Sequence, residues 1–597
     1  MRFLAVIIVI MSGFAFANCP LDEDPIIPPY VGVEGVQLDR SGAVLYTGSR
    51  EYGNRIMLIA AVIPANASNK AVTWSSSDSA VVTVEDGEVT AVGAGNACIT
   101  ATTDDGGFID TCTIEVIPLV YYSDYGAAGD GETDDFDAII AAHTSANLIA
   151  AAGGRAKVMA DPGKTYYIGG ASKTSVIQTD TDWGDANFII DDTKVSGAGT
   201  WIFRIESAQQ SINVLNRVSV PIVKNQAQVT LSPPLAGAAL LVAVDYTTIR
   251  YIRSGSNANN GGSQRDVFII DKDGIVDTNA SIIWDFNNIS SLTAYPIDEK
   301  QLAVTGGRFT TIADDTVTSV YMSRGIQINR SNTLIEGLRH TVINEITQIR
   351  PYSGFLSIST CANVTVQNCM LTGRRVYNRV GTYDIVSDTA VNLKIINCGQ
   401  TNSIADNTYW GIFASNYSKN ILFDNVSFSR FDAHQGVYNA TIKNSELGHQ
   451  GLCVIGSGTL RIENTKVWSS PCFIEFRSDY GSSWEGNVYI ENCTYYPPSN
   501  NLNGSRIFDT GNDGRHNYGY PCTMPEFIYI DGFRVEDNNA AYNGIELVTG
   551  SSSYGGSWPY TLTDTIFIKN YSSPSGIKWR FTNSYLRSNI KVIEIDG

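Results

Sequence analysis

Residues 393–397 read Leu-Lys-Ile-Ile-Asn, and the same order recurs through the last half of the chain: apolar, any, apolar, any, then Asn or Gly. Each copy alternates like a short β-strand and ends at a residue type that tolerates a left-handed backbone. A strand with its turns cannot bury its own apolar face, so the copies must stack, which predicts a β-solenoid. The copies span residues 302–306, 333–337, 364–368, 393–397, 421–425, 440–444, 460–464, 488–492, 528–532 and 566–570.

The spacing of the copies varies along the chain. Successive terminal residues lie 31, 31, 29, 28, 19, 20, 28, 40 and 38 positions apart. Between Asn425 and Asn464 the repeats shorten and leave no room for long loops, whereas the longer repeats must carry loops. Because a compact strip bordered by loops forms an elongated binding surface, we expect a functional site on the rungs after Asn425.

The net charge of -19 argues against nucleic acid as a partner, because phosphate binding needs a basic surface. An acidic surface keeps an exported protein soluble, which is the simplest reading of this charge. An anionic polysaccharide would need a local basic patch or a bound cation.

The N-terminus predicts export. Residues 1–17 have a short basic start, an apolar stretch and a small-x-small site at Ala15-Phe-Ala17, as in a cleaved signal peptide. The alternative is lipid modification at Cys19. No later apolar stretch is long enough to cross a bilayer, so we expect no membrane insertion after cleavage and a secreted or cell-surface location. Residues 18–32, rich in Pro and acidic groups, predict a linker.

Residues 33–118 predict a small β-sandwich, because short apolar alternations are separated by turn residues. Cys98 and Cys112 flank a predicted hairpin, where a disulfide between adjacent strands is an option. The segment resembles the bacterial Ig-like domain of group 2, a family of spacers and weak adhesion modules. The resemblance rests on Val72-Thr-Trp-Ser-Ser-Ser-Asp78, Gly87-Glu-Val-Thr-Ala-Val-Gly93 and Ala97-Cys-Ile-Thr-Ala-Thr102.

A helix is predicted over residues 136–152, with Thr133 as its cap and two aspartates at its positive end. Gly126, Gly129-Asp-Gly131, Thr133-Asp-Asp135 and Asp161-Pro-Gly-Lys-Thr-Tyr-Tyr-Ile168 resemble the opening of the pectate-lyase-like superfamily, which includes many phage tailspikes. This resemblance implies that the helix closes one end of a right-handed parallel β-helix over residues 119–597. The predicted fold class is therefore all-β, a right-handed parallel β-helix preceded by a small Ig-like sandwich.

Candidate catalytic residues gather on the short rungs. An extended segment 430–434 would project Arg430, Asp432 and His434 from one face, because side chains alternate along a strand. Alignment by the motif Asn sets Arg430 beside His449. The later rung offers the alternating set Glu475, Arg477 and Asp479.

These residue types suit cleavage of a glycosidic bond. Hydrolysis needs a protonated carboxyl and a second carboxylate, which Asp432, Glu475 and Asp479 supply. Elimination from a uronic acid needs a base and a cation, for which His434, His449 and the arginines serve. The alternative is a structural ladder of ion pairs on the outer face of the solenoid.

A second resemblance covers residues 381–484 and adds Asp384 to the candidates. It is to secreted bacterial β-helix proteins of unassigned activity and rests on Gly381-Thr-Tyr-Asp-Ile385, Tyr409-Trp-Gly-Ile412, residues 429–442, Ile455-Gly-Ser-Gly-Thr459 and residues 477–484. The chain shows neither the Asp-Asp and His-Gly rungs of a polygalacturonase nor the arginine motif of pectate lyases. Aromatic rings stack on sugars or fill turns, and on the first reading the substrate-binding residues are Tyr409, Trp410, Tyr480 and Trp484.

The leading hypothesis is a polysaccharide-active protein, a hydrolase or a lyase. The alternative is a non-catalytic glycan-binding adhesin or a tailspike-like fibre, which would be a homotrimer. No cofactor is required, and calcium is left open: residues 271–277 resemble a calcium loop but lack its remaining ligands, so a turn is predicted there. Residues 250–263 predict a long exposed loop.

Overall fold

The computed structural model describes residues 29–48, 53–314, 316, 318–345, 350–375, 381–537 and 544–595. The predicted signal peptide and Cys19 lie outside these residues. The chain forms two compact units that divide after Val116. Among the described residues, none of the helices has the length and apolar character needed to cross a membrane.

The first unit is an antiparallel β-structure around a core that includes Leu45, Val82 and Ile99. Cys98 lies opposite Thr113 and Cys112 opposite Ile99, so the two thiols point to opposite faces of the hairpin and both are free. The suggested disulfide is therefore wrong. The strands are β1 Gly35–Leu38, β2 Gly42–Thr47, β3 Arg55–Met57, β4 Ala60–Ile63, β5 Val72–Ser76, β6 Val82–Glu85, β7 Glu88–Ala91, β8 Gly95–Thr103 and β9 Ile109–Tyr121.

The second unit begins with helix α1 (Phe136–Ala151), which buries Phe136, Ile139 and Ala142 against the solenoid core. The predicted helix is confirmed, but its cap is not Thr133. The Thr133 hydroxyl donates to Asp130 instead. Asp135 is the N-cap residue, and its carboxylate accepts the backbone N–H groups of the preceding turn.

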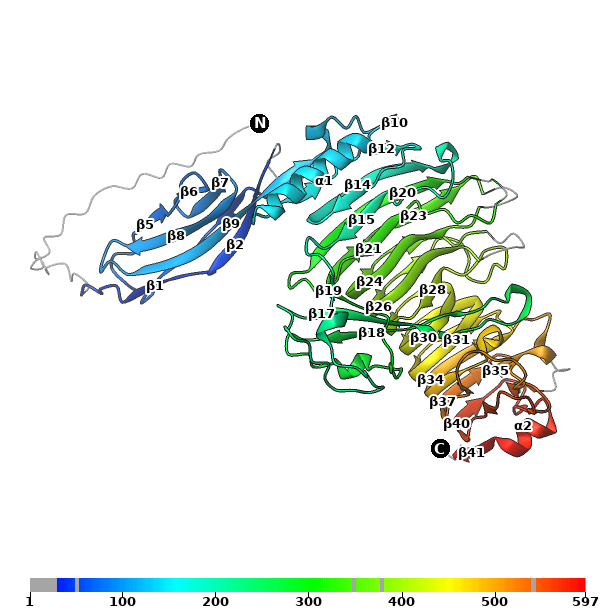
Figure 1. The fold of residues 1–597 in the computed structure, drawn as a ribbon. Coiled ribbons are helices and arrows are strands. Elements are labelled where there is room, and N and C mark those ends of the chain that lie inside the picture. The colour runs from blue at the N-terminus through cyan, green and yellow to red at the C-terminus, as the bar shows by residue number, and fades with distance from the viewer. Residues whose placement is uncertain are drawn as a thin grey trace, which may run out of the picture. The chain divides into compact units, whose positions relative to one another are not determined.

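The solenoid is a parallel β-helix whose rungs follow one another in chain order (Figure 1). All ten motif copies pair with their neighbours in parallel and in register, from Leu302 opposite Thr333 to Ile528 opposite Ile566. The middle apolar residue of each copy is at most 4% exposed. Every terminal Asn or Gly has a left-handed φ, between 47° and 72°. The motif therefore fixes the register of the stack.

Asparagine amides form ladders on both sides of the motif strands. The terminal residues Asn368, Asn397 and Asn425 are linked by their side chains. A second ladder, absent from our sequence analysis, stands just before the strands. It joins Asn332, Asn363, Asn392, Asn420 and Asn439, all with left-handed φ, over distances of 2.8–3.2 Å.

The strands of the solenoid have the following bounds. The first rungs contain β10 Asp130–Asp134, β11 Lys157–Met159, β12 Thr165–Ile168, β13 Ser175–Ile177, β14 Asp180–Asp191, β15 Phe203–Glu206, β20 Leu302–Ile312, β21 Ile326–Asn329, β22 Thr333–Glu336, β23 Arg339–Ile343, β24 Ser353–Gln367, β25 Met370–Leu371, β26 Tyr383–Ile396 and β27 Gly399–Gln400. The later rungs contain β28 Phe413–Asn416, β29 Lys419–Asp424, β30 Ser427–Lys443, β31 Glu446–Glu463, β32 Lys466–Trp468, β33 Cys472–Phe476, β34 Trp484–Tyr496, β35 Arg506–Asp509, β36 Cys522–Thr523, β37 Phe527–Val535, β38 Glu546–Thr549, β39 Tyr560–Thr561, β40 Thr565–Ser572 and β41 Lys591–Ile595, with helix α2 at Ser584–Asn589.

Residues 212–296 interrupt the solenoid with an antiparallel sheet, which we call the inserted sheet. It packs on the solenoid through Leu240 and Val267, which contact Ala362 and Val391. It has a core of its own and the strand order β16-β19-β17-β18. Its strands are β16 Ile212–Asn213, β17 Ala239–Arg250, β18 Gly262–Ile270 and β19 Ser291–Pro296.

The tip of the inserted sheet corrects one expectation. Residues 250–263 were predicted as an exposed loop, and residues 255 and 257–261 are indeed exposed between β17 and β18. The start of the segment is not, because Tyr251 is only 4% exposed and packs among the rings of Tyr417, Tyr480 and Tyr520. The turn at Asp271 is present, because its carboxylate accepts two backbone N–H groups from residues 273 and 275.

Candidate active site

A row of polar side chains crosses four adjacent strands on one outer face of the solenoid. Asp432 in β30 lies opposite Cys453 in β31, Cys453 opposite Glu475 in β33, and Glu475 opposite Asp509 in β35. The neighbours of Glu475, Ile474 and Phe476, are fully buried, so strand alternation directs Glu475 outward. Adjacent strands lie about 4.8 Å apart, so Asp432 and Glu475 are separated by about 10 Å at the backbone. We call this set the carboxylate row.

Asp432 is enclosed by two arginines. Its side chain is 0% exposed, Arg477 Nη1 lies 2.8 Å from Oδ1, and Arg430 Nη2 lies 2.9 Å from Oδ2. Burial alone would raise the pKa of Asp432, but the two guanidinium groups together hold it below its usual value. Asp432 is therefore an ionised carboxylate and not a proton donor near neutral pH.

The ion-pair cluster extends to the inserted sheet. Arg477 donates to both oxygens of Asp479, and Arg253 Nη2 lies 2.7 Å from Asp479 Oδ2. Tyr480, 1% exposed, lies beneath both arginines at 5.3–5.6 Å. Arg253 was missed by the sequence analysis because it lies in a segment predicted as an exposed loop and its partner, Asp479, comes from a distant rung.

His434 is part of the same cluster. Its Nδ1 lies 2.8 Å from Asn416 Oδ1, and its ring meets Tyr480 edge-on at 5.3 Å. Burial lowers the pKa of His434 to about 4, more than the opposing effect of Asp432 raises it. The imidazole is therefore neutral at pH 7.

Glu475 and Asp509 are the accessible pair of the carboxylate row. Glu475 is half-buried and accepts a weak bond from the Cys453 thiol at 3.5 Å, and no ion pair of the described residues includes it. Asp509 accepts from Arg506 Nη2 at 2.6 Å. One carboxyl thus has no cation partner, while its neighbour is paired with a guanidinium.

Asp509 was also missed by the sequence analysis. Its offset from the preceding motif Asn differs from that of Glu475, so alignment of rungs by the Asn does not bring the two together. Arg506 and Asp509 flank two adjacent apolar residues, Ile507 and Phe508, so no alternating pattern marked Asp509 in the sequence.

The remaining predicted residues lie elsewhere. Asp384 is buried and binds His340 Nδ1 at 2.9 Å, away from the cluster. His449 Nε2 binds the Tyr409 carbonyl at 2.8 Å, and Arg430 covers the Trp410 ring at 5.6 Å. Trp484 is 0% exposed with its indole N–H on the Gly458 carbonyl, so its ring has no free face for a sugar. The same burial applies to Tyr480.

Comparison with known proteins supports the predicted fold of both units. The model of the bacterial Ig-like domain (group 2) matches residues 50–114. This segment is a group 2 bacterial Ig-like domain. A protein of Bacillus cereus named only as uncharacterized is 32% identical over 99 residues, which cover 16% of this chain and 71% of that protein. An α-L-arabinofuranosidase of Bifidobacterium longum subsp. longum is 39% identical over 117 residues, 18% of this chain and only a tenth of that protein's length.

The β-helix is similar to a solved tailspike of Pseudomonas phage phi297. The TM-score is 0.51 at 14% sequence identity, over 79% of this chain and 83% of the tailspike. At this identity the likeness shows a shared fold. The fold class expected from sequence, a parallel β-helix preceded by an Ig-like domain, is therefore confirmed. All residues of the carboxylate row belong to the β-helix unit and none to the Ig-like domain.

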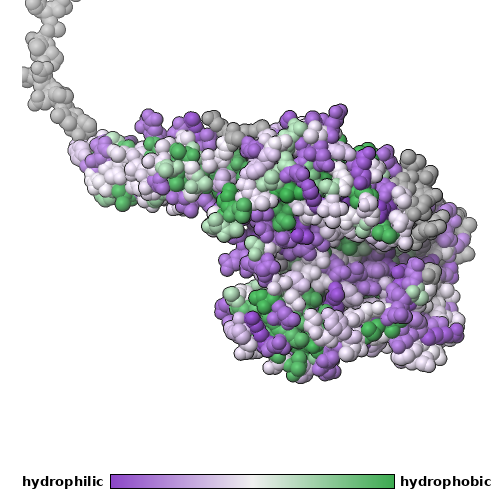
Figure 2. Space-filling model, turned by 45° about the horizontal axis from the view of Figure 1, so that its top comes forward, coloured by the Kyte–Doolittle hydropathy of each residue, from purple (hydrophilic) through white to green (hydrophobic). Residues whose placement is uncertain are grey.

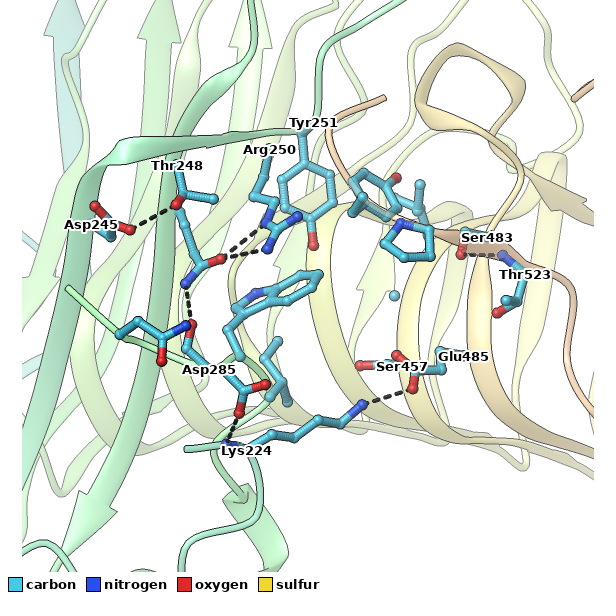
Figure 3. Close-up of a pocket in the computed structure, with 18 of the residues that line it drawn as sticks. Lys224, Asp245, Thr248, Arg250, Tyr251, Asp285, Ser457, Ser483, Glu485 and Thr523 are labelled. Atoms are coloured by element: carbon cyan, nitrogen blue, oxygen red, sulfur yellow. Dashed lines mark hydrogen bonds and ion pairs between the residues drawn. The ribbon is translucent and has the colours of Figure 1, made fainter. Parts of the chain in front are cut away.

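A cleft lies between the inserted sheet and the part of the β-helix that contains Ile455, Gly456, Ser457, Ser483 and Glu485 (Figure 3). Its volume is about 660 Å³. The space-filling view shows hydrophilic residues over much of the visible face and a hollow near its middle (Figure 2).

Within the described residues, no group of three or more His, Cys, Asp or Glu side chains is arranged to hold a metal ion. Calcium binding stays a prediction.

Proposed function

We propose that this protein hydrolyses a polysaccharide outside the cell, on the carboxylate row of its β-helix. The observation that carries the proposal is the pair Glu475 and Asp509, two half-buried carboxyl groups on adjacent strands. The likeness in fold to a phage tailspike supports an extracellular role, in which the Ig-like domain serves as a spacer.

The two carboxyl groups suit different roles. Glu475 forms no ion pair among the described residues, and we assign it the role of general acid toward the leaving oxygen. Asp509 is paired with Arg506, and we assign it the role of nucleophile. A separation of one strand, about 5 Å, is that of retaining glycosidases, in which the carboxylate attacks the sugar and the acid then activates water. We therefore expect retention of the anomeric configuration.

Elimination is less well supported. A lyase needs a free cation to neutralise the sugar carboxylate, but Arg430 and Arg477 are both paired with Asp432. In this proposal Asp432 and its two arginines have a positioning role. Their ion pairs hold β30 in place relative to β33, the strand that carries Glu475. A glycan-binding protein without catalysis is the alternative, and the test separates the two.

The test is to incubate the full chain with a panel of polysaccharides and to follow reducing ends together with the absorbance of unsaturated uronates. New reducing ends without that absorbance support hydrolysis, and both signals together mean a lyase. Glu475→Gln and Asp509→Asn should each lower the rate at least 100-fold. The control is Glu446→Gln, a carboxylate on another face paired with Lys466, which should keep full activity. Retention on a glycan column without cleavage would instead support a glycan-binding protein without catalysis.

A further inference from the structure

The cleft under the inserted sheet has two walls of different origin. The inserted sheet supplies Thr248, Arg250 and Trp284, and the β-helix supplies Ser457, Ser483 and residues 520–523. Lys224 Nζ and Glu485 Oε1, 2.7 Å apart, join the two walls at one end (Figure 3). Its volume of about 660 Å³ is within the range of small-ligand sites.

Arg250 is the unusual residue of this cleft. Its Nε and Nη2 donate to Gln264 Oε1 at 3.0 and 2.8 Å, and its Nη1 donates to the Gly519 carbonyl. Gln264 is fully buried and donates its own amide to the Asp285 carbonyl, which fixes its oxygen toward Arg250. The guanidinium is therefore held in one orientation by neutral acceptors.

The charge of Arg250 has no counterpart in contact with it. No ion pair of the described residues includes Arg250, and the nearby Asp245 is occupied by the hydroxyls of Thr247 and Thr248. Burial lowers the pKa of Arg250, because the charged form loses part of its hydration. A half-buried cation without an anion is costly, and it gains most when a ligand brings one. Three of its five N–H groups are used, which leaves two as donors.

The rest of the lining suits a sugar ring. Arg250 lies over the Trp284 indole at 4.6 Å, and the rings of Tyr251 and Tyr520 extend the aromatic side of the cleft. Hydroxyl groups line the opposite side, and the buried Thr523 Oγ1 has no hydrogen-bond partner. A ligand with both an apolar ring face and several hydroxyls matches this lining.

The acidic groups of the cleft limit the charge of the ligand. Asp245, Asp285 and Glu485 outnumber Lys224 and Arg250, so a dianionic group such as phosphate would be repelled. Arg250 has one N–H group left on each of Nη1 and Nη2, and a single carboxylate can accept from these two donors. We propose that this cleft binds a carboxylated sugar unit of a glycan, with the carboxylate on Arg250 and the ring beside Trp284. This site is separate from the carboxylate row and does not depend on cleavage there.

The test is calorimetric titration of the full chain carrying Glu475→Gln, so that binding is measured without turnover. The probes are trisaccharides of galacturonate, glucuronate and mannuronate, each paired with its methyl ester, and inorganic phosphate. At least one acid should bind ten-fold or more tightly than its ester. Adding Arg250→Gln should remove that preference while binding of the ester is unchanged, which also shows that the cleft is intact, and Arg250→Lys should keep part of the preference.

The matched control is Arg461→Gln. Arg461 also lies 4.6 Å over a ring, that of Tyr489, but it is paired with Glu463 and Glu491. Its replacement should change neither affinity. The proposal is overturned if none of the three acids binds more tightly than its ester, if the preference survives Arg250→Gln, or if phosphate competes as well as the acid. Each of these results is independent of whether Glu475 and Asp509 cleave a glycan.

Discussion

Replacement of Asn392 tests what the second asparagine ladder, which stands before the motif strands, contributes to the stability of the β-helix. The Asn392 amide donates to Asn363 at 2.9 Å and accepts from Asn420 at 2.8 Å, and its φ is 59°. Asn392→Gly and Asn392→Ala both lose two hydrogen bonds, at about 1 kcal/mol each. Alanine adds about 1–2 kcal/mol of left-handed strain, whereas glycine costs about 0.4–1 kcal/mol through the freedom of the unfolded chain.

We therefore expect both variants to be less stable by at least about 2 kcal/mol, with alanine the worse by about 1 kcal/mol. The assay is equilibrium urea unfolding of the full chain followed by circular dichroism, in which the β-helix transition is compared between variants. Lys394→Ala, an exposed change on the same strand, is the control and should be near neutral. The reasoning on the ladder is refuted if both Asn392 variants match the control, and the reasoning on strain if alanine is as stable as glycine.

Three further predictions concern single residues of the β-helix. The pKa of His434 in the folded chain is about 4, below its unfolded value of 6.5, so the unfolded chain binds the proton first as pH falls. The free energy of unfolding should therefore decline by up to about 3 kcal/mol between pH 6.5 and 4. His434→Gln should flatten that part of a stability-pH profile. Asp432→Asn removes the carboxylate of the buried Arg430 and leaves Arg477 with Asp479 alone, so it should cost about 3 kcal/mol in urea unfolding. An unchanged midpoint would contradict the enclosed ion pair. Gly448→Ala would bring Cβ to 1.7 Å from the Ile404 carbonyl oxygen and should cost about 1–3 kcal/mol in thermal unfolding, whereas Gly237→Ala, which has open space, should not.

The sequence was informative wherever contacts join equivalent positions of successive rungs. Each motif has inward side chains at a period of two and a left-handed terminal residue, so a slip by one residue would turn Ile395 or Phe423 outward. Beyond the motif the alignment is wrong: it set Arg430 beside His449, but a register shift after Phe428 places Arg430 opposite Gly451. Arg430, Asp432 and Arg477 nevertheless form one cluster. Their catalytic roles are still predictions.

The contacts that sequence could not predict cross between the inserted sheet and distant rungs. Arg253 and Asp479 meet only because the inserted sheet folds back over the β-helix, and no local pattern specifies that docking. Asp509 was hidden for another reason, because the loop before it changes the offset from the motif. Asp384 became a candidate through a resemblance and not through the rung pattern, and its buried side chain contacts His340.

The inserted sheet has a consequence for how the β-helix opens. In a plain solenoid each rung contacts only its neighbours, so unfolding can begin at one end and proceed rung by rung. Here one sheet contacts Ala362 and Val391 and also reaches the Gly519 carbonyl and Asp479. Rungs that are far apart in the stack are thus fastened to a common body. Amide hydrogen exchange of these rungs should be governed by one shared opening event, with graded fraying confined to rungs outside its reach.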